Sequence, residues 1–284
     1  MSTVELAPAR TLPRLNRMPS IQALLSLLVV VLLVVAVIAP GVLTDRSPTA
    51  IDLGATLQPP SWTHPFGTDD AGRDLLTRVI HGSRQSLGIG LGATALAFTI
   101  AVVLGFTAAL GGGVVDAAIT RVLEVAFAFP ALLLALLVIT VRGPSLTTAI
   151  VAVGIGSAPG YARMVRGQVL AVRQAGYVEA AAALGHPWFS VLRRHLFPNA
   201  MRPLVAVATL GIGQSIVWAS GLSFLGLGVP PPSSEWGALL DAGRAHITTS
   251  WWLEILPGLV IVVVALAATS LGRTVQNLLG GAAR

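Results

Sequence analysis

Residues 177–199 of this chain are Tyr177-Val-Glu-Ala-Ala-Ala-Ala-Leu-Gly185-His-Pro-Trp-Phe-Ser-Val-Leu-Arg-Arg-His-Leu-Phe-Pro-Asn199. Residues 174–184, which include the start of this stretch, are rich in alanine, the residue with the highest helix propensity. Gly185 supplies the left-handed residue that commonly ends a helix, and Pro187 suits the first turn of a second helix. The stretch therefore predicts two short helices that meet at a corner.

The second of these helices carries an apolar stripe formed by Trp188, Phe189, Leu192, Leu196 and Phe197. The stripe lies within an arginine-rich loop, 164–202, between two long apolar runs. An apolar stripe in such a loop needs a cover, which is either a lipid surface or a protein partner. Two interpretations follow: a helix at the membrane interface, or a knob that fits a groove on a second protein.

The chain around this loop has the composition of a membrane protein. Hydrophobic residues make up 54% of its 284 residues and charged residues only 11%, and the mean hydropathy is +0.80. A helix needs about 20 residues to cross a hydrocarbon layer about 30 Å thick. We therefore expect an all-α polytopic membrane protein with six transmembrane helices, one in each charge-free window of at least 17 residues: 18–44, 85–115, 125–141, 143–162, 203–234 and 255–272.

The arginines predict the orientation of these helices. The first apolar run, 21–40, is too long for a signal peptide and lacks a small-x-small cleavage site, so it is interpreted as a signal anchor. If the N-terminus is cytoplasmic, 12 of the 18 arginines fall in cytoplasmic segments and six fall outside. This split matches the positive-inside bias. Both termini are therefore expected in the cytoplasm.

Two absent residue types exclude several functions. The chain has no cysteine, which excludes disulfides, thiolate metal sites and thiol catalysis. It also has no lysine, because all 18 basic residues are arginine. A nucleotide-binding loop of the form G-x-x-x-x-G-K-[ST] needs its lysine on the phosphates, so no cofactor is expected in this chain, and any ATP is expected on another one. Nucleic acid is not expected as a partner, because the arginines are spread along the chain without interleaved aromatic residues.

The segment between the first two spans, 41–85, is expected outside the cytoplasm. Thr68 is the predicted N-cap of a helix with Asp69 and Asp70 in its first turn. A metal site built from His64, the two aspartates and Asp74 is the alternative, but capping and solvation account for all four side chains. The helix should be amphipathic and lie at the outer interface, because its apolar residues share one face: Leu75, Leu76, Val79 and Ile80.

Five further helices are expected after this segment. The second helix, near 86–110, should end at the glycine run 111–113, and the third should begin near Asp116 and kink at Pro130. An ion pair between Arg121 and Glu124 is expected at the cytoplasmic interface. The last three helices are expected near 145–163, 203–227 and 252–272.

The loop 164–202 also carries a family resemblance. Glu179-Ala180-Ala181, followed after three residues by Gly185 and then by a segment that closes at Pro198, resembles the E-A-A-x-x-x-G motif of ATP-binding-cassette importer permeases. The resemblance implies that this loop is a coupling helix that docks into an ATP-binding subunit. The residues expected to couple to that subunit are Glu179, Ala180, Ala181, Gly185, Pro187, Trp188, Phe189, Leu192 and Pro198.

Further motifs narrow the resemblance to the C-type permease subunits of dipeptide, oligopeptide and nickel importers. These motifs are Gly67-Thr-Asp-Asp-Ala-Gly-Arg-Asp74, Arg121-Val-Leu-Glu-Val-Ala-Phe-Ala-Phe-Pro130, Phe224-Leu-Gly-Leu-Gly-Val-Pro230 and the pair Trp251-Trp252. The tail after Gly272 departs from the family pattern, so its part in docking is left open. The ending His195–Asn199 is closer to the peptide branch, and a nickel importer is the alternative.

The resemblance implies a type I ABC importer permease fold in a bacterial cytoplasmic membrane. It implies no enzyme activity in this chain and three kinds of partner: a homologous B-type permease subunit, two ATP-binding cassette subunits with ATP and magnesium, and an extracytoplasmic substrate-binding protein. The expected organisation is a cytoplasmic tail, 1–20; a first transmembrane helix, 21–40; an extracytoplasmic segment, 41–85; a five-helix core, 86–272; and a cytoplasmic tail, 273–284.

Two other classes of protein fit the sequence less well. An intramembrane hydrolase needs a nucleophile with a base, but the serines of window 203–234 have no partner histidine there. A carrier coupled to protons or sodium usually places a carboxylate near the middle of the membrane. The last three predicted helices have none there, so both classes rank below the permease.

Overall fold

A computed structural model describes residues 21–281 of the protein. The predicted N-terminal tail, 1–20, and the last three residues lie outside this range. The described residues form helices joined by loops and short 3-10 and π segments: α1 (Ile21–Ile38), α2 (Leu75–Leu110), α3 (Gly113–Ala128), α4 (Ala131–Arg142), α5 (Leu146–Arg173), α6 (Gly176–Ala183), α7 (Trp188–Val191), α8 (Phe197–Leu222), α9 (Trp236–Arg244) and α10 (Trp252–Gly281).

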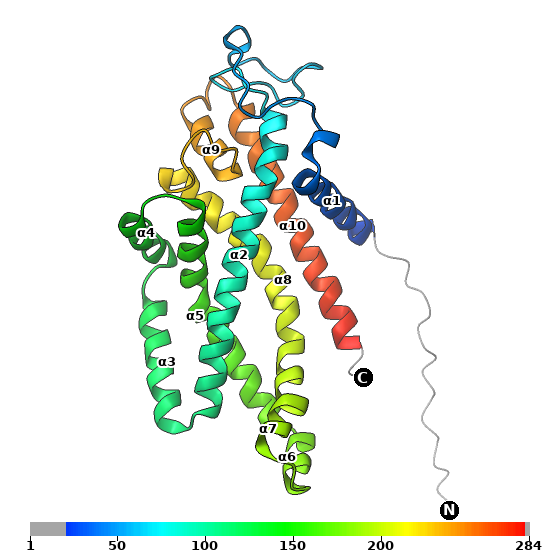
Figure 1. The fold of residues 1–284 in the computed structure, drawn as a ribbon, viewed down its shortest axis with the longest axis vertical. Helices are drawn as coiled ribbons and strands as arrows, with labels where there is room; N and C mark the ends of the chain where they lie inside the picture. The colour runs from blue at the N-terminus through cyan, green and yellow to red at the C-terminus, as the bar shows by residue number, and fades with distance from the viewer. Residues whose placement is uncertain (1–20, 282–284) are drawn as a thin grey trace, which may run out of the picture.

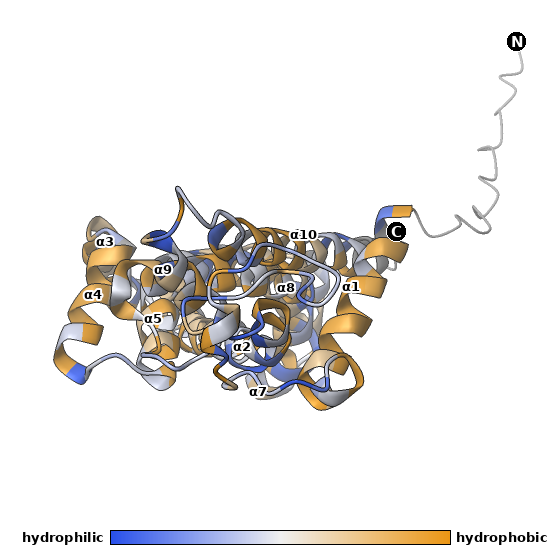
Figure 2. Cartoon of the chain, turned by 90° about the horizontal axis from the view of Figure 1, so that it is seen from above, coloured by the Kyte–Doolittle hydropathy of each residue, from blue (hydrophilic) through white to orange (hydrophobic). Residues whose placement is uncertain are grey.

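The bundle is built around α2, which packs most extensively against α5, while α8 packs against α10 and α2. In Figure 1 α1 and α10 lie on one side of α2 and α8, and α3, α4 and α5 lie on the other side. Small residues let α2 and α5 approach closely: a Cβ atom added at Gly105 would lie 2.7 Å from the Cβ of Val165. Seen from above, the outer helices α1 and α4 are hydrophobic, and hydrophilic loops lie over α2 (Figure 2).

The helices confirm an all-α membrane protein with several spans. Among the described residues, three helices can cross a membrane by length and composition: Leu75–Leu110, Trp188–Leu227 and Trp252–Gln276. The bent pair α3 and α4 makes a fourth if it counts as one span. The apolar stretch of α1 is shorter, Leu24–Ile38, and α5 is rich in glycine, serine and threonine. The count of six spans therefore stays a prediction.

The helix expected around 67–80 does not form as predicted. Thr68 is buried in a loop, where its hydroxyl donates to the carbonyl of Ala55, and the N-cap is Asp74, which accepts from the Thr77 N–H at 2.8 Å. The apolar face of residues 75–80 begins α2 itself and packs inward. The prediction of a separate interfacial helix was wrong, because α2 begins at Leu75, before the charge-free window 85–115, and Arg78 within this added stretch is neutralised inside the protein.

Asp69 neutralises Arg78 and ties three segments together. Its carboxylate accepts from Arg78 Nη1 at 2.6 Å and from Arg73 Nε at 2.7 Å, and the side chains of Asp69 and Arg78 are 5% and 4% exposed. Arg78 Nη2 also donates to the carbonyl of Ser233 at 2.8 Å. The loop before α2, the first turn of α2 and the loop before α9 are thus held together at one end of the bundle.

A second buried acid caps α9, a helix that the sequence did not predict. Glu235 is 1% exposed, and its carboxylate accepts from the N–H groups of Gly237 and Ala238, both at 2.9 Å. Burial raises the pKa of Glu235, although these hydrogen bonds act in the opposite direction. The side chain is therefore positioned by helix capping in a site that disfavours its charge.

The break at Pro130 is sharper than the predicted kink. α3 ends at Ala128, Pro130 is the N-cap of α4, and the two helices meet at 87°. Proline has no N–H to continue the α3 hydrogen-bond ladder, so the chain leaves the helix there. The predicted ion pair is present, with Arg121 3.2 Å from Glu124 on the exposed face of α3.

Candidate coupling surface and pathway cavity

The corner between α6 and α7 has the predicted geometry. α6 ends at Ala183, and Gly185 follows with φ +79°. The Gly185 N–H donates to the carbonyl of Ala182 at 3.0 Å, and the His186 N–H donates to that of Ala181 at 3.3 Å. This pair of bonds is the Schellman motif that closes a helix end. Pro187 is the N-cap of α7, one position earlier than expected.

Four buried side chains fasten this corner to the bundle. Val178, Ala181, Val191 and Leu196 are each at most 6% exposed and belong to one apolar cluster with residues of α2, α5 and α8. Because both arms of the corner are anchored in this cluster, the corner cannot move far without moving the ends of α5 and α8.

An apolar surface remains exposed on the far side of the corner. Leu184 is 78% exposed, Phe189 69%, Trp188 53% and Tyr177 47%. We call these four residues the coupling surface. α6 and α7 project at the end of the bundle opposite the loop that joins α1 to α2 (Figure 1). Leu184 was missed in the sequence, although a hydrophobic residue just before a helix-ending glycine was the available signal.

The predicted coupling residues divide into exposed and anchored positions. Glu179 and Ala180 are exposed, whereas Ala181 faces the core. Of the predicted stripe, Trp188 and Phe189 stay exposed and Leu196 is fully buried. Leu192 and Pro198, two further residues predicted to couple, are half-buried. The stripe is therefore not one continuous docking face.

The second arm of the corner is not an isolated short helix. α7 continues through a π-helical segment, Leu192–Leu196, directly into α8. Phe197 remains exposed, with its ring centroid 5.3 Å from that of Phe106 on α2. The expected start of this span at 203 was wrong, because Pro198 lies at the first turn of α8 and Pro203 is accommodated within the helix.

A cavity of about 440 Å³ lies between α3, α5 and α8. Its polar lining residues are Ser157 and Tyr161 of α5 and Gln214 of α8, and none of the described residues that line it is charged. The rest of the wall includes aromatic and small residues: Phe127, Phe129, Trp218, Gly156 and Gly160. The sequence carried a signal for this cavity, since the α5 residues that line it recur at intervals of three and four positions, as residues on one helix face do.

The model of the family described as "Binding-protein-dependent transport system inner membrane component" matches residues 101–282, more than half of the chain and including both the corner and the cavity. The chain belongs to this family of permeases. The resemblance in the loop 164–202 is therefore confirmed at the level of the family.

Curated relatives of this permease are similar over most of its length. The probable D,D-dipeptide transport system permease protein DdpC of Escherichia coli is 39% identical over 89% of this chain and 85% of its own. The dipeptide transport system permease protein DppC of Alkalihalophilus pseudofirmus is 36% identical over 87% and 81%. The glutathione transport system permease protein GsiD of Pectobacterium atrosepticum is 35% identical over 89% and 84%.

Solved structures share the fold of this permease. The MetNI methionine ABC transporter in an inward-facing conformation matches with a TM-score of 0.55 at 20% identity, over 71% of this chain and 96% of that one. An amino acid ABC transporter with histidines matches with a TM-score of 0.53 at 21% identity, over 66% and 90%. The expected type I ABC importer permease fold is thereby confirmed.

Proposed function

We propose that this permease is the C-type subunit of a peptide importer and forms half of its translocation pathway. A homologous B-type permease forms the other half, two ATP-binding cassette subunits hydrolyse ATP with magnesium, and an extracytoplasmic binding protein delivers the peptide. The observation that carries the proposal is the coupling surface, because it exposes large apolar side chains on a corner that is anchored to the bundle.

The corner is suited to transmit motion to the cavity. α6 follows α5 almost directly, and α7 runs into α8. The same two helices supply the polar wall of the cavity, Ser157 and Tyr161 from α5 and Gln214 from α8. A partner that pulls on Trp188 and Phe189 in one state and releases them in another would therefore shift that wall. The chain itself then needs no nucleotide site.

The lining of the cavity favours a peptide over nickel. The hydroxyl groups of Ser157 and Tyr161 and the amide of Gln214 can exchange hydrogen bonds with a peptide backbone. The aromatic wall accommodates side chains of varied shape. Nickel prefers imidazole or carboxylate ligands, and the described lining offers neither. An uncharged wall also holds a zwitterion weakly, so that the peptide can leave.

The orientation we propose places both termini and the coupling surface in the cytoplasm. The native chain has no cysteine, so single cysteines report access without background. Cysteines replacing Ser61 and His186, both exposed, should react with a membrane-impermeant maleimide from opposite sides of the membrane. Labelling of His186→Cys in intact cells would contradict the orientation and the coupling role together.

The decisive experiment reconstitutes the full importer and its binding protein in liposomes. Di- to pentapeptides and nickel are compared for stimulation of ATP hydrolysis and for uptake. Peptide-dependent stimulation is expected in the wild type and should be lost in Trp188→Asp. A response to nickel alone would refute the peptide substrate, whereas peptide uptake by Trp188→Asp at the wild-type rate would refute the coupling surface.

A further inference from the structure

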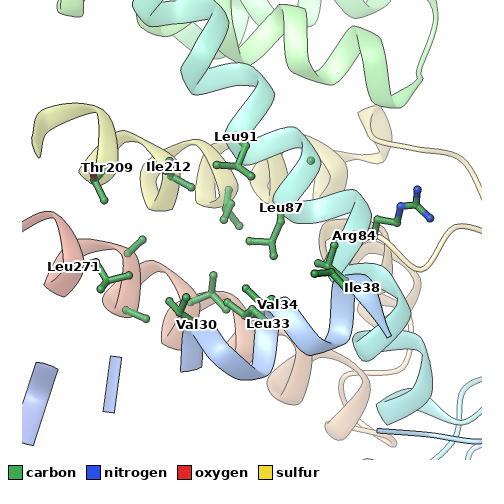
Figure 3. A pocket seen from close by; sticks show the side chains of 16 residues that line it. Val30, Leu33, Val34, Ile38, Arg84, Leu87, Leu91, Thr209, Ile212 and Leu271 are labelled. Atoms are coloured by element: carbon green, nitrogen blue, oxygen red, sulfur yellow. The ribbon is translucent and has the colours of Figure 1, made fainter. Parts of the chain in front are cut away.

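A second cavity, of about 430 Å³, lies on the other side of the bundle between α1, α2, α8 and α10 (Figure 3). Its lining residues are aliphatic or glycine except for Arg84 of α2 and Thr209 of α8. α1 reaches the bundle beside this cavity, where it contacts α10 and α2. An apolar space of this size between membrane helices needs an apolar occupant.

Arg84 stands at one end of the apolar cavity. Its aliphatic stem lies beside Ile38 at the end of α1, and its guanidinium group points away from the cavity (Figure 3). Within residues 21–281 no ion pair joins Arg84 to a carboxylate, although the nearby Arg46, Arg73 and Arg78 each have one. Arginine adopts this posture at a membrane interface, with the stem in the apolar layer and the charge outside it.

A polar cavity of about 470 Å³ meets the apolar one at Arg84, which lines both. Its other walls include Thr49, His81, Gln85 and Ser233. Gln85 Oε1 accepts from the Ser233 hydroxyl at 2.7 Å, so the amide NH₂ of Gln85 remains a hydrogen-bond donor. The molecule therefore offers an apolar slot, a cation at its mouth and a polar chamber beyond, in that order.

We infer that this composite site binds one phospholipid, with an acyl chain in the apolar cavity and the phosphate on Arg84. The residues of α1 that line the slot run from Val30 to Ile38, a length of about 12 Å at 1.5 Å per residue. A hydrocarbon core of about 30 Å gives each leaflet about 15 Å, so the slot matches a chain of one leaflet. A transmembrane helix of the partner permease crosses both leaflets, so it would need a groove about twice as long as this slot.

The charge of the site identifies the head-group chemistry. An arginine at the rim of a pocket between membrane helices pairs with the phosphate of a lipid head group. The polar chamber beyond it has room for the remainder of the head group. The lipid belongs to the leaflet next to the loop 40–74, because Ile38 and Arg84 lie at that end of their helices. It fills the space between α1 and the core helices.

Two variants test the two halves of the site in the full importer complex. Arg84→Gln removes the charge and keeps a polar side chain. Gly88→Leu fills the slot, because Gly88 lines it and a Cβ atom added there meets nothing within 4 Å. The matched controls are Arg142→Gln, an exposed arginine at the end of α4, and Gly221→Leu, an exposed glycine of α8 with equally open space.

The measurement is the number of phospholipids retained per complex, by native mass spectrometry after exchange into detergent with added phosphatidylglycerol. One retained lipid is expected in the wild type and in both controls. Loss of a charge-assisted hydrogen bond should weaken retention in Arg84→Gln about tenfold, and Gly88→Leu should abolish it.

Three results would overturn the inference. The first is a wild-type complex without retained phospholipid, and the second is unchanged retention in both Arg84→Gln and Gly88→Leu. The third is efficient cross-linking of a cysteine at position 88 to the partner permease, which would show a helix in the slot. Peptide transport is not a criterion in this experiment, so its outcome is independent of the proposed substrate.

Discussion

Asp116 of α3 and Arg166 of α5 are joined by two hydrogen bonds, 2.5 Å from Arg166 Nε to Oδ1 and 2.6 Å from Nη2 to Oδ2. α3 carries Phe127, which lines the cavity between α3, α5 and α8, and α5 leads to the corner between α6 and α7. Above the ion pair, the guanidinium of Arg163 lies 4.7 Å from the centroid of the Phe127 ring. The pair therefore ties the first turn of α3 to α5, the helix that leads to the corner.

Asp116→Asn should uncouple transport from ATP hydrolysis. Both side chains are about a quarter exposed, so loss of the pair should cost about 1 kcal/mol. This corresponds to an about fivefold smaller equilibrium population in which α3 stays attached to α5. We expect about fivefold less peptide uptake per ATP hydrolysed. Arg121→Gln, which breaks an exposed pair on the same helix, is the control and should behave as wild type. The swap Asp116→Arg with Arg166→Asp should restore part of the coupling.

Gly185→Ala should destabilise the corner through the backbone alone. The residue has φ +79°, and a Cβ atom there would meet nothing within 4 Å, so the penalty is the left-handed conformation, about 1 kcal/mol. Gly185→Val should cost more, because a β-branched side chain is stiffer. Gly176→Ala has the same open space without positive φ and serves as the control. Binding of ATPase subunits, measured by co-purification, should fall only in the Gly185 variants.

Trp188→Asp and Phe189→Asp should each weaken binding of the ATP-binding subunits. Large aromatic residues at the centre of an interface contribute 2 kcal/mol or more, which corresponds to about 30-fold in affinity. Val114→Asp is a matched control, because Val114 is apolar, 85% exposed and lies in the first turn of α3. Titration of the purified ATPase subunit against the permease pair in nanodiscs measures the affinity. Equal losses at all three positions would mean that the coupling surface has no special role.

Asp69→Asn should destabilise the loop before α2 by about 3–5 kcal/mol, because it leaves the buried Arg78 charge without compensation. Neighbouring Asp70 has a side chain that is 59% exposed and reaches Arg73 only at 3.4 Å. Asp70→Asn should therefore change stability by less than about 0.5 kcal/mol. Thermal unfolding and limited proteolysis of the segment 40–74 distinguish the two variants. A neutral Asp69→Asn would show that water, rather than Asp69, compensates Arg78.

Glu235 should make stability depend on pH. Burial raises its pKa in the folded protein, so the folded protein favours the protonated carboxyl. The stability gained from this is fully present below the pKa of the unfolded chain and is lost as pH rises through the folded pKa. The melting temperature of the wild type should therefore fall, relative to that of Glu235→Gln, as pH rises above 4.5, the ordinary pKa of this side chain. The glutamine keeps an oxygen acceptor for the Gly237 N–H. Parallel melting curves at every pH would contradict the assignment.

Several features of the fold could be predicted because they depend on neighbouring residues only. The left-handed turn at Gly185 and the end of α3 before Pro130 follow from the backbone chemistry of glycine and proline. Thr68 illustrates the opposite case. It satisfied the local rule for an N-cap, but its hydroxyl donates to Ala55 in the folded protein, and Asp74 caps the helix instead. Local capping rules cannot rank two candidates when a distant segment binds one of them.

The class of protein, the family and the glycine corner between α6 and α7 follow from the linear chain, because the apolar windows, the absence of lysine and the E-A-A motif are visible in it. Which apolar side chains remain exposed depends instead on the packing of the helices. Leu196 and Trp188 belong to the same predicted stripe, yet one is fully buried and the other is 53% exposed. Burial depends on which distant helix packs against a residue. The cavity between α3, α5 and α8 and the slot beside α1 arise where three or four such helices do not pack fully against one another.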